Sequence, residues 1–378
     1  MFIVNLITSV FIGYFVIFLL GSRAVRNESK PIKDKLSPLS IIIPAYNEDK
    51  VMSKCLESVV AQGEIVKEII VILDNCEDKT KEICRSWKSD KIRLIHKKDH
   101  QPSKVGSILL GLAKVKDNYF VVVDADTILK PQAIESVYRY TIDTKADFAT
   151  CLIDPFETKK NFVYQFISWD RILRQRIIQL GKEYFRMSNF PGCFGVVKTR
   201  KYKQLVAYHI LEDLVLTYTS IRLGYKLRVY PEVMAFEQEK TTLRCLFMQR
   251  IRWTIGNIYT IGHFAKTMLK VNLRRKLILL SYPLLWYGLY YFITFLGLAY
   301  LISHKTEFLV NYLVLILSIL IILLYTRIHF GDFRIIDLVT MPLFVIFFPI
   351  VITLALLSGI LLLLKRRINI FSRAYFER

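Results

Sequence analysis

Two aspartates one residue apart, Asp124 and Asp126, follow the hydrophobic run Tyr119–Val123. The run predicts a buried strand, and alternate residues leaving a strand tip can both reach one cation. Carboxylate oxygens suit Mg²⁺ and Mn²⁺. A cation held there would also bind diphosphate oxygens and neutralise a phosphate leaving group as its bond breaks. An aspartate pair in a turn is more often solvated than bound to metal, so the surrounding sequence must decide between the two interpretations.

Two further strand-like runs also end in polar residues. Leu39–Ile43 leads into Pro44–Glu48, and Glu68–Leu73 leads into Asp74. Another strand is predicted at Ile92–Ile95, with helical stretches up to Ala61, at Lys79–Trp87 and at Ser103–Val115. This alternation predicts an α/β, Rossmann-like sheet. Because ligands bind beyond the carboxyl ends of the strands in such sheets, we expect these polar residues and Asp124–Asp126 to line one crevice.

Five short motifs run through this part of the chain. They are P-A-Y-N-E at 44–48, D-N-C-E-D-K-T from Asp74, D-A-D at 124–126, L-E-D-L with Glu212 and Asp213, and Q-R-I-R-W at Gln249–Trp253. Between Asp213 and Gln249 lie 35 residues. In this order and with this interval, residues 37–258 resemble the membrane-bound inverting family-2 glycosyltransferases, similar to the cellulose, chitin and hyaluronan synthase group. The resemblance implies an α/β GT-A-like cytosolic domain inserted between transmembrane helices.

The resemblance implies that Asp213, with Glu212 beside it, is the catalytic carboxylate. An inverting transfer needs a base that deprotonates the acceptor hydroxyl as it attacks the anomeric carbon. Asp213 opens a predicted helix, Asp213–Leu223. Without the other motifs, we would interpret it as an acidic residue stabilised by the helix dipole.

The nucleotide-sugar site is also implied by the resemblance. Asp74 resembles the carboxylate that accepts from a uracil ring, Ala45, Tyr46 and Glu48 resemble the pocket wall, and Lys104 resembles a basic residue near the phosphates. The resemblance also implies that Asp124 belongs to the nucleotide-sugar site as well as to the metal site. A turn or cap residue is the alternative interpretation of Asp74.

Gln249, Arg252 and Trp253 share one face of a predicted helix, since they are spaced i, i+3 and i+4. Arg252 could bind diphosphate oxygens with its fork of donors, and Trp253 could support a sugar ring. Alternatively, Trp and Arg anchor an amphipathic helix at the membrane interface. The glycine-containing loop Asn189–Lys198 suits a close approach to an acceptor. Cys193 in this loop is interpreted as a buried thiol.

Apolar runs at both ends of the chain predict membrane spans. Residues 2–20 carry no charge, and the basic residues follow them, which favours a retained anchor over a cleaved signal peptide. Towards the other end lie Leu277–Ile302, Phe308–Thr326 and Ile336–Leu364. The last run contains Pro342 and Pro349, so a kinked span and a broken helical pair are both open, giving three or four spans in this region.

These patterns predict five regions along the chain. They are an N-terminal transmembrane helix (1–22), a cytosolic GT-A domain (37–258), a juxtamembrane segment (259–276), a transmembrane region (277–364) and a basic cytosolic tail (365–378). Asn161–Leu180 has helical periodicity and is interpreted either as a surface helix or as a helix at the membrane interface.

The net charge of +21 suits a membrane surface or an anionic substrate. Nucleic acid is excluded as a partner because no basic helix with interleaved aromatics and no zinc spacing accompanies the charge. The six cysteines match neither a zinc site nor a redox pair, which indicates free thiols in a reducing compartment.

The sequence and the resemblance together predict an inverting β-glycosyltransferase, a hexosyltransferase or N-acetylhexosaminyltransferase, in the plasma or cell membrane. It would use a UDP-sugar and Mg²⁺ or Mn²⁺ and extend a polysaccharide, processively and with export. Transfer of a single sugar to a membrane lipid is the alternative. A catalytically silent nucleotide-binding scaffold is a third, less favoured hypothesis, because a binding module has no need of a catalytic base.

Overall fold

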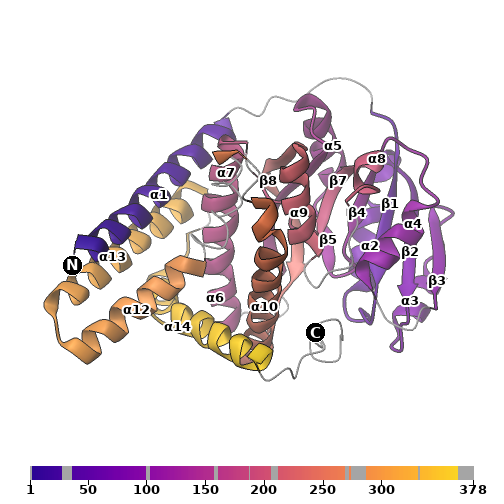
Figure 1. Ribbon diagram of the computed structural model, residues 1–378. Helices are drawn as coiled ribbons and strands as arrows, with labels where there is room; N and C mark the ends of the chain where they lie inside the picture. Colours follow the sequence, from indigo (N-terminus) through magenta and orange to yellow (C-terminus); the bar gives the residue numbers. More distant parts are fainter. Residues whose placement is uncertain are drawn as a thin grey trace. The chain divides into compact units, whose positions relative to one another are not determined.

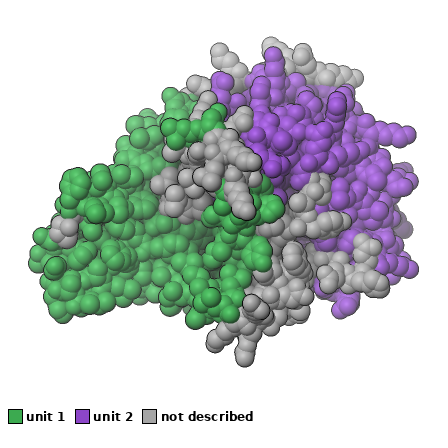
Figure 2. All heavy atoms as spheres, viewed as in Figure 1, with its two compact units in different colours: residues 1–27, 157–185, 239–378 green, residues 28–156, 186–238 purple. Residues whose placement is uncertain are grey.

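The computed structural model describes residues 2–27, 36–98, 103–156, 161–186, 188–205, 212–268, 272–273, 287–330 and 333–364. The chain divides into two compact units, which Figure 2 shows in different colours. Unit 1 comprises residues 1–27, 157–185 and 239–378, and unit 2 comprises residues 28–156 and 186–238. Each unit is therefore assembled from segments that are far apart in the sequence.

Unit 2 is built on one eight-stranded mixed sheet in the order β3-β2-β1-β4-β7-β6-β8-β5 (Figure 1). The strands are β1 (Leu39–Ala45), β2 (Val66–Asp74), β3 (Ile92–Lys97), β4 (Tyr119–Val123), β5 (Thr127–Leu129), β6 (Phe148–Phe156), β7 (Phe194–Lys198) and β8 (Leu227–Gln238). The strands β3, β2, β1 and β4 are parallel, whereas β7 runs antiparallel to β4 and β6. The sheet therefore has a Rossmann-like half, where the sequence predicted parallel strands, joined to a mixed half.

Helices of unit 2 connect and cover the strands. They are α2 (Met52–Val60), α3 (Thr80–Ser86), α4 (Lys104–Leu112), α5 (Ala133–Asp143), α8 (Thr199–Tyr202) and α9 (Glu212–Leu223), with a 3-10 turn η1 at Gly63–Ile65. The central strands are buried on both faces; Ile41, Ile42 and Ile43 are each 0 % exposed. Continuous apolar runs are typical of such doubly covered strands. These buried strands fix the polar residues that follow them at one edge of the sheet.

Unit 1 is helical. Its elements are α1 (Phe2–Asn27), α6 (Phe162–Arg171), the π-helix η2 (Ile172–Gln179), α7 (Leu180–Tyr184), α10 (Leu243–Met268), α12 (Gly288–Ser303), α13 (Thr306–Phe330) and α14 (Asp337–Leu364). Within the described residues, three helices are long and apolar enough to cross a membrane: Phe2–Val25, Thr306–Phe330 and Asp337–Leu364. α14 is a single helix with Pro342 and Pro349 inside it, rather than a broken pair. Part of the predicted run Leu277–Ile302 and the whole basic tail lie outside the described residues.

The segment Asn161–Leu180 is not a surface helix, so that interpretation is wrong. Almost every side chain from Val163 to Glu183 is buried, because the segment packs against α1, α13 and α14 inside unit 1. Trp169 is 0 % exposed, and its indole N–H donates to Thr340 at 3.1 Å. Two arginines of the segment, Arg171 and Arg174, are held inside the unit by the carboxylates of Glu239 and Asp170.

Candidate functional site

The tip of β4 is fixed by main-chain hydrogen bonds. The Asp124 amide donates to the Cys193 carbonyl at 2.8 Å, and the Asp126 carbonyl accepts from the Gln238 amide at 3.0 Å. The Cys55 thiol donates to the Asp124 carbonyl. Burial raises the pKa of the Cys55 thiol, and the nearby carboxylates of Asp126 and Asp124 raise it further, so this thiol stays protonated. Neighbouring strands and α2 therefore hold both predicted metal ligands.

Lys104 reaches this tip from the first residue of α4. Its Nζ lies 2.8 Å from Asp124 Oδ2 and 3.3 Å from the Gly192 carbonyl oxygen. The helix start is defined by Ser103, whose hydroxyl accepts from the Gly106 amide as an N-cap. Lys104 therefore forms an ion pair with Asp124, whereas its contact with the donor phosphates stays a prediction.

Gly192 brings Asp213 to the same place. Its φ of +81° is a left-handed conformation that favours glycine, and a Cβ there would lie 2.9 Å from Asp213 Cβ and 3.4 Å from Lys104 Nζ. Asp124, Lys104, Gly192 and Asp213 therefore form one cluster, which we call the strand-tip cluster. The loop Asn189–Lys198, singled out in the sequence as an acceptor loop, supplies its glycine.

Asp213 is held at the start of α9. Its carboxylate accepts from the following Leu214 amide at 2.8 Å, and its carbonyl accepts from the Thr217 hydroxyl at 2.9 Å. The same hydroxyl accepts from the Phe190 amide at 3.1 Å, which ties the helix to the glycine loop. Glu212 is the first residue of α9, and its side chain lies outside the described residues.

Asp74, at the end of β2, is 2 % exposed and already makes several hydrogen bonds. Its carboxylate accepts from Lys97 Nζ at 3.0 Å, from the Ser103 amide at 2.7 Å and from the Ser107 hydroxyl at 2.9 Å. Ser103 and Ser107 flank the start of α4, so Asp74 anchors the helix that carries Lys104. A nucleotide contact for Asp74 stays a prediction, beside this structural role.

The predicted pocket wall follows β1. The Ala45 carbonyl accepts from the Cys76 thiol at 3.4 Å, and the Glu48 amide donates to the Thr80 hydroxyl at 2.8 Å. Tyr46 lies between them and is partly exposed. The loop after β1 is therefore joined to the loop after β2, as expected for adjacent parallel strands.

The residues present fit a divalent cation. Asp124 and Asp126 supply two carboxylates from one strand tip, the donor type that Mg²⁺ and Mn²⁺ prefer. Among the described residues, no group of three His, Cys, Asp or Glu side chains is placed to hold a metal. Two carboxylates together with phosphate oxygens are, however, a usual ligand set for a nucleotide-bound Mg²⁺.

Gln249, Arg252 and Trp253 lie on α10, in unit 1 rather than in unit 2 with the strand-tip cluster. The Trp253 ring is contacted by two guanidinium groups, Arg250 at 4.3 Å and Arg174 at 5.4 Å from its centroid. Such cation–π contacts fix the ring in place. The Trp253 ring therefore has a fixed position within unit 1.

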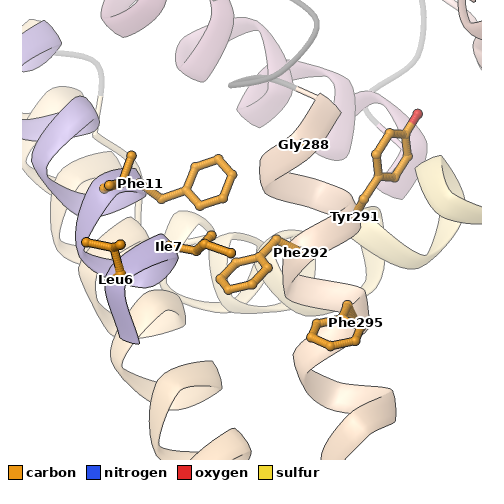
Figure 3. A pocket seen from close by; sticks show the side chains of 8 residues that line it. Leu6, Ile7, Phe11, Gly288, Tyr291, Phe292 and Phe295 are labelled. Carbon is orange, nitrogen blue, oxygen red and sulfur yellow. The ribbon is translucent and has the colours of Figure 1, made fainter. Parts of the chain in front are cut away.

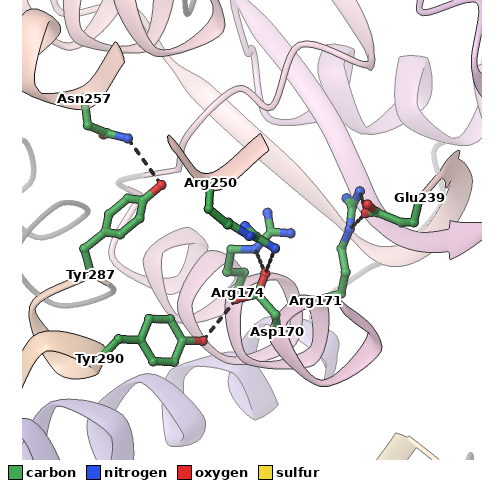
Figure 4. Close-up of polar contacts among 8 residues, drawn as sticks. All are labelled: Asp170, Arg171, Arg174, Glu239, Arg250, Asn257, Tyr287 and Tyr290. Atoms are coloured by element: carbon green, nitrogen blue, oxygen red, sulfur yellow. Dashed lines mark hydrogen bonds and ion pairs between the residues drawn. The ribbon is translucent and has the colours of Figure 1, made fainter. Parts of the chain in front are cut away.

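Sequence reasoning missed a buried ionic group beside Trp253 (Figure 4). Asp170, 0 % exposed, accepts from Arg250 at 2.9 Å, from Arg174 at 3.0 Å and from the Tyr290 hydroxyl at 3.0 Å. Burial alone would raise the pKa of Asp170, but Arg250 and Arg174 outweigh it and lower the pKa below its ordinary value. Arg171 pairs with Glu239 nearby in the same view. In the sequence, the one signal for this buried ionic group was Arg250, which lies inside the Q-R-I-R-W motif.

Unit 1 also carries an apolar groove between α1 and α12 (Figure 3). The groove measures about 560 Å³ and is lined by Leu6, Ile7, Val10, Phe11, Gly288, Tyr291, Phe292 and Phe295. The rings of Phe11 and Phe292 stack at 5.5 Å between the two helices. An apolar lining of this kind suits a hydrocarbon chain.

The predicted thiol character of the cysteines agrees with the structure. No disulfide joins the six cysteines, all of which lie in the described part of the chain. Cys193 is 3 % exposed and directly precedes β7, as expected for a buried thiol.

Several known proteins are similar to this chain. Residues 40–205 match the family model "Glycosyl transferase family 2". The chain is 28 % identical over 269 residues to the probable glycosyltransferase YdaM of Bacillus subtilis, covering 68 % of this chain and 64 % of that protein. It is 23 % identical over 233 residues to the poly-beta-1,6-N-acetyl-D-glucosamine synthase of Staphylococcus aureus, covering 59 % and 55 %. The chain thus spans less than two thirds of the length of these relatives.

A solved structure is similar along almost the whole chain. It is the mannosyltransferase PcManGT from Pyrobaculum calidifontis in complex with GDP-Man and Mn²⁺, with a TM-score of 0.57 and 15 % identity, covering 97 % of this chain and 99 % of that one. At this identity the likeness concerns the fold, and it confirms the predicted GT-A-like architecture. Residues 40–205 are therefore similar to a glycosyltransferase family 2 domain, and they lie within a GT-A-like fold.

Proposed function

We propose that the strand-tip cluster is the catalytic centre of a metal-dependent, inverting transfer from a nucleotide sugar. One observation carries this proposal: Asp124, Lys104, Gly192 and Asp213 lie together in the strand-tip cluster. With Asp126 next to Asp124 at the same strand tip, the site has two carboxylates suited to a cation, a lysine suited to phosphate and, in Asp213, a third carboxylate suited to a proton. These are the groups that such a transfer requires.

In the proposed reaction, the acceptor hydroxyl oxygen forms a bond to the anomeric carbon of the donor sugar. Asp213 takes the proton of that hydroxyl. The bond between the anomeric carbon and the diphosphate oxygen breaks, and the electron pair leaves with the nucleoside diphosphate. Asp124 and Asp126 would hold a divalent cation, which would neutralise charge on this leaving group. Lys104 adds a positive charge at the same edge of the sheet. Glu212 is proposed as the neighbour of the catalytic base, Asp213.

We propose a UDP-sugar as the donor. Its uracil ring would be bound by Asp74 and by the pocket wall of Ala45, Tyr46 and Glu48. The support is the resemblance of the Asp74 motif and the join between the loops after β1 and β2. The similar mannosyltransferase structure is a complex with GDP-Man and Mn²⁺, so a guanine nucleotide is the comparison that a donor panel must include. Gln249, Arg252 and Trp253 are proposed to contribute from α10.

We propose a growing polysaccharide as the acceptor, extended processively and exported across a membrane. The relative named as a poly-beta-1,6-N-acetyl-D-glucosamine synthase supports this acceptor class. The apolar groove between α1 and α12 favours a second candidate, transfer to a membrane lipid. The chain would be an integral membrane protein through the three apolar helices, with unit 2 on the cytosolic side.

A donor panel tests the proposal. Purified full-length protein in detergent is incubated with UDP-glucose, UDP-N-acetylglucosamine, UDP-galactose and GDP-mannose, each with Mg²⁺ or Mn²⁺. We expect release of nucleoside diphosphate from a UDP-sugar, and its loss on chelation. Release from GDP-mannose alone would contradict the UDP assignment, and release from no donor would contradict the proposal as a whole.

A further inference from the structure

Thr217 connects two parts of the strand-tip cluster by hydrogen bonds. It lies four residues after Asp213 on α9 and is 2 % exposed. Its hydroxyl donates to the Asp213 carbonyl at 2.9 Å and accepts from the Phe190 amide at 3.1 Å. A hydroxyl has one donor and two acceptor positions, so it can make both bonds at once. One buried oxygen therefore joins the main chain of Asp213 to the loop that contains Gly192.

Phe190, at the other end of this connection, is anchored in the sheet of unit 2. It is 4 % exposed, and its ring packs edge-on against Phe148 of β6 with the ring centroids 6.1 Å apart. The same ring occupies the space that a side chain on Gly195 of β7 would need. The bond from the Phe190 amide therefore holds Thr217 against a residue whose own position is fixed by the sheet.

Asp213 lies in the part of α9 that the helix itself holds least firmly. It is the second residue of α9, and the amides of the first helical turn have no partner inside the helix. On one side, Gly192 packs directly against it, since a Cβ on Gly192 would lie 2.9 Å from the Cβ of Asp213. On the main-chain side, the Thr217 hydroxyl holds its carbonyl. These two contacts together restrict where the Asp213 carboxylate can lie.

A threonine that donates to the carbonyl four residues earlier is common in helices and does not by itself indicate a function. Thr141 of α5 makes the same bond, to the Val137 carbonyl at 2.6 Å, and is 0 % exposed. Thr217 differs in two respects. Its hydroxyl also accepts from a segment outside its own helix, and the carbonyl that it holds belongs to Asp213.

We propose that Thr217 is a positioning residue for Asp213, whose carboxylate it holds beside the Gly192 loop where an acceptor hydroxyl can lose its proton. This inference rests on the proposed function, in which Asp213 is the base. A base must lie within hydrogen-bond reach of the proton that it takes, and a small misplacement lowers the rate strongly. Thr217 therefore acts on kcat, whereas the donor binds through other residues.

The test uses the full-length protein in detergent with a UDP-sugar that the wild type cleaves, and it follows the release of UDP at saturating Mn²⁺. Thr217→Val keeps the shape of the side chain but removes the acceptor of the Phe190 amide. We expect kcat to fall about tenfold while the KM for the UDP-sugar stays within about twofold of the wild-type value. Thr217→Ser restores the hydroxyl and should keep kcat within about twofold. A wild-type kcat in Thr217→Val, or a serine variant as slow as the valine variant, would overturn the proposal.

Thr141→Val is the matched control. It makes the same chemical change at a buried helical threonine of unit 2, and α5 carries no residue of the strand-tip cluster. We expect a wild-type kcat, and thermal unfolding in detergent reports the loss of stability in both valine variants. An equal fall in kcat in the two variants would overturn the proposal, because the effect would then come from packing.

A double variant separates this inference from the proposed function. Adding Thr217→Val to Asp213→Asn should lower the residual turnover no further, since the base that Thr217 positions is already absent. A further tenfold fall would overturn the positioning role. If Asp213→Asn alone is slow and Thr217→Val is not, only this inference is wrong. If Asp213→Asn turns over at the wild-type rate, the proposed base and this inference are both wrong.

Discussion

Each unit of the molecule holds a carboxylate against a cation, and the two pairs differ in exposure. In unit 2, Asp124 meets Lys104 at 2.8 Å with side chains 11 % and 19 % exposed. In unit 1, Asp170 meets Arg250 at 2.9 Å with side chains 0 % and 1 % exposed. Lysine is a compact charge on a flexible stem, whereas the planar arginine fork forms a more rigid pair. The first pair can therefore exchange a partner for a ligand, and the second is a fixed part of the fold.

The partly exposed pair is suited to contact a ligand, whereas the buried pair is suited to hold other residues in position. A partly exposed pair at a strand tip lies where ligands bind in α/β sheets, and its lysine can turn from carboxylate to phosphate. A sealed pair contributes to stability only as long as both partners remain, since removing one leaves a buried charge without compensation. Substitutions in the two units should therefore affect different measurements.

The largest effect on activity is expected for Asp213→Asn. An amide cannot take the acceptor proton, so turnover should fall about 10²–10⁴-fold, while UDP binding measured by calorimetry stays near the wild-type value. Transfer at the wild-type rate in this variant would remove Asp213 from the role of base.

The largest effect on stability is expected for Asp170→Asn. Arg250 and Arg174 would lose their counter-charge inside unit 1, and the protein should lose about 3–5 kcal/mol of unfolding free energy. Because the pKa of Asp170 is lowered in the folded state, its contribution should be complete above its ordinary pKa of 3.8 and should fade as the pH falls through the lower folded value. Thermal unfolding in detergent at several pH values measures both effects.

Lys67→Met is the control for that measurement. Lys67 pairs with Asp117 at 2.7 Å, but its side chain is 49 % exposed, so its removal should cost less than about 1 kcal/mol. A loss as large as that of Asp170→Asn would show that burial does not distinguish the two kinds of pair.

The sequence predicted the positions of residues that are adjacent along the chain, but not the pairing of residues that are far apart in it. Apolar runs that end in polar residues placed Asp74 and Asp124 at one sheet edge, since strand and following residue are adjacent in sequence. Asp213 and Lys104 lie beside the same residue, Gly192, whose left-handed backbone no local pattern specifies. Asp170 and Arg250 are 80 residues apart, so their pairing could not be predicted from periodicity. For the same reason, the helical periodicity of Asn161–Leu180 did not reveal that this segment is buried.

A smaller effect is expected for Lys104→Met. The donor phosphates would lose one charge-assisted hydrogen bond, so the KM for the UDP-sugar should rise about tenfold with a smaller change in kcat. Steady-state kinetics at saturating metal measure this split. A variant with unchanged donor KM would show that Lys104 serves only as the counter-charge of Asp124.

The exchangeable pair at the strand tip is tested most directly by calorimetric titration of UDP into the full-length protein with Mn²⁺ and after chelation. We expect binding at least about tenfold tighter with Mn²⁺ than without it, and loss of this difference in Asp124→Asn. Equal affinity in both conditions, or an unchanged metal effect in Asp124→Asn, would contradict the assignment of this carboxylate to a metal and nucleotide site.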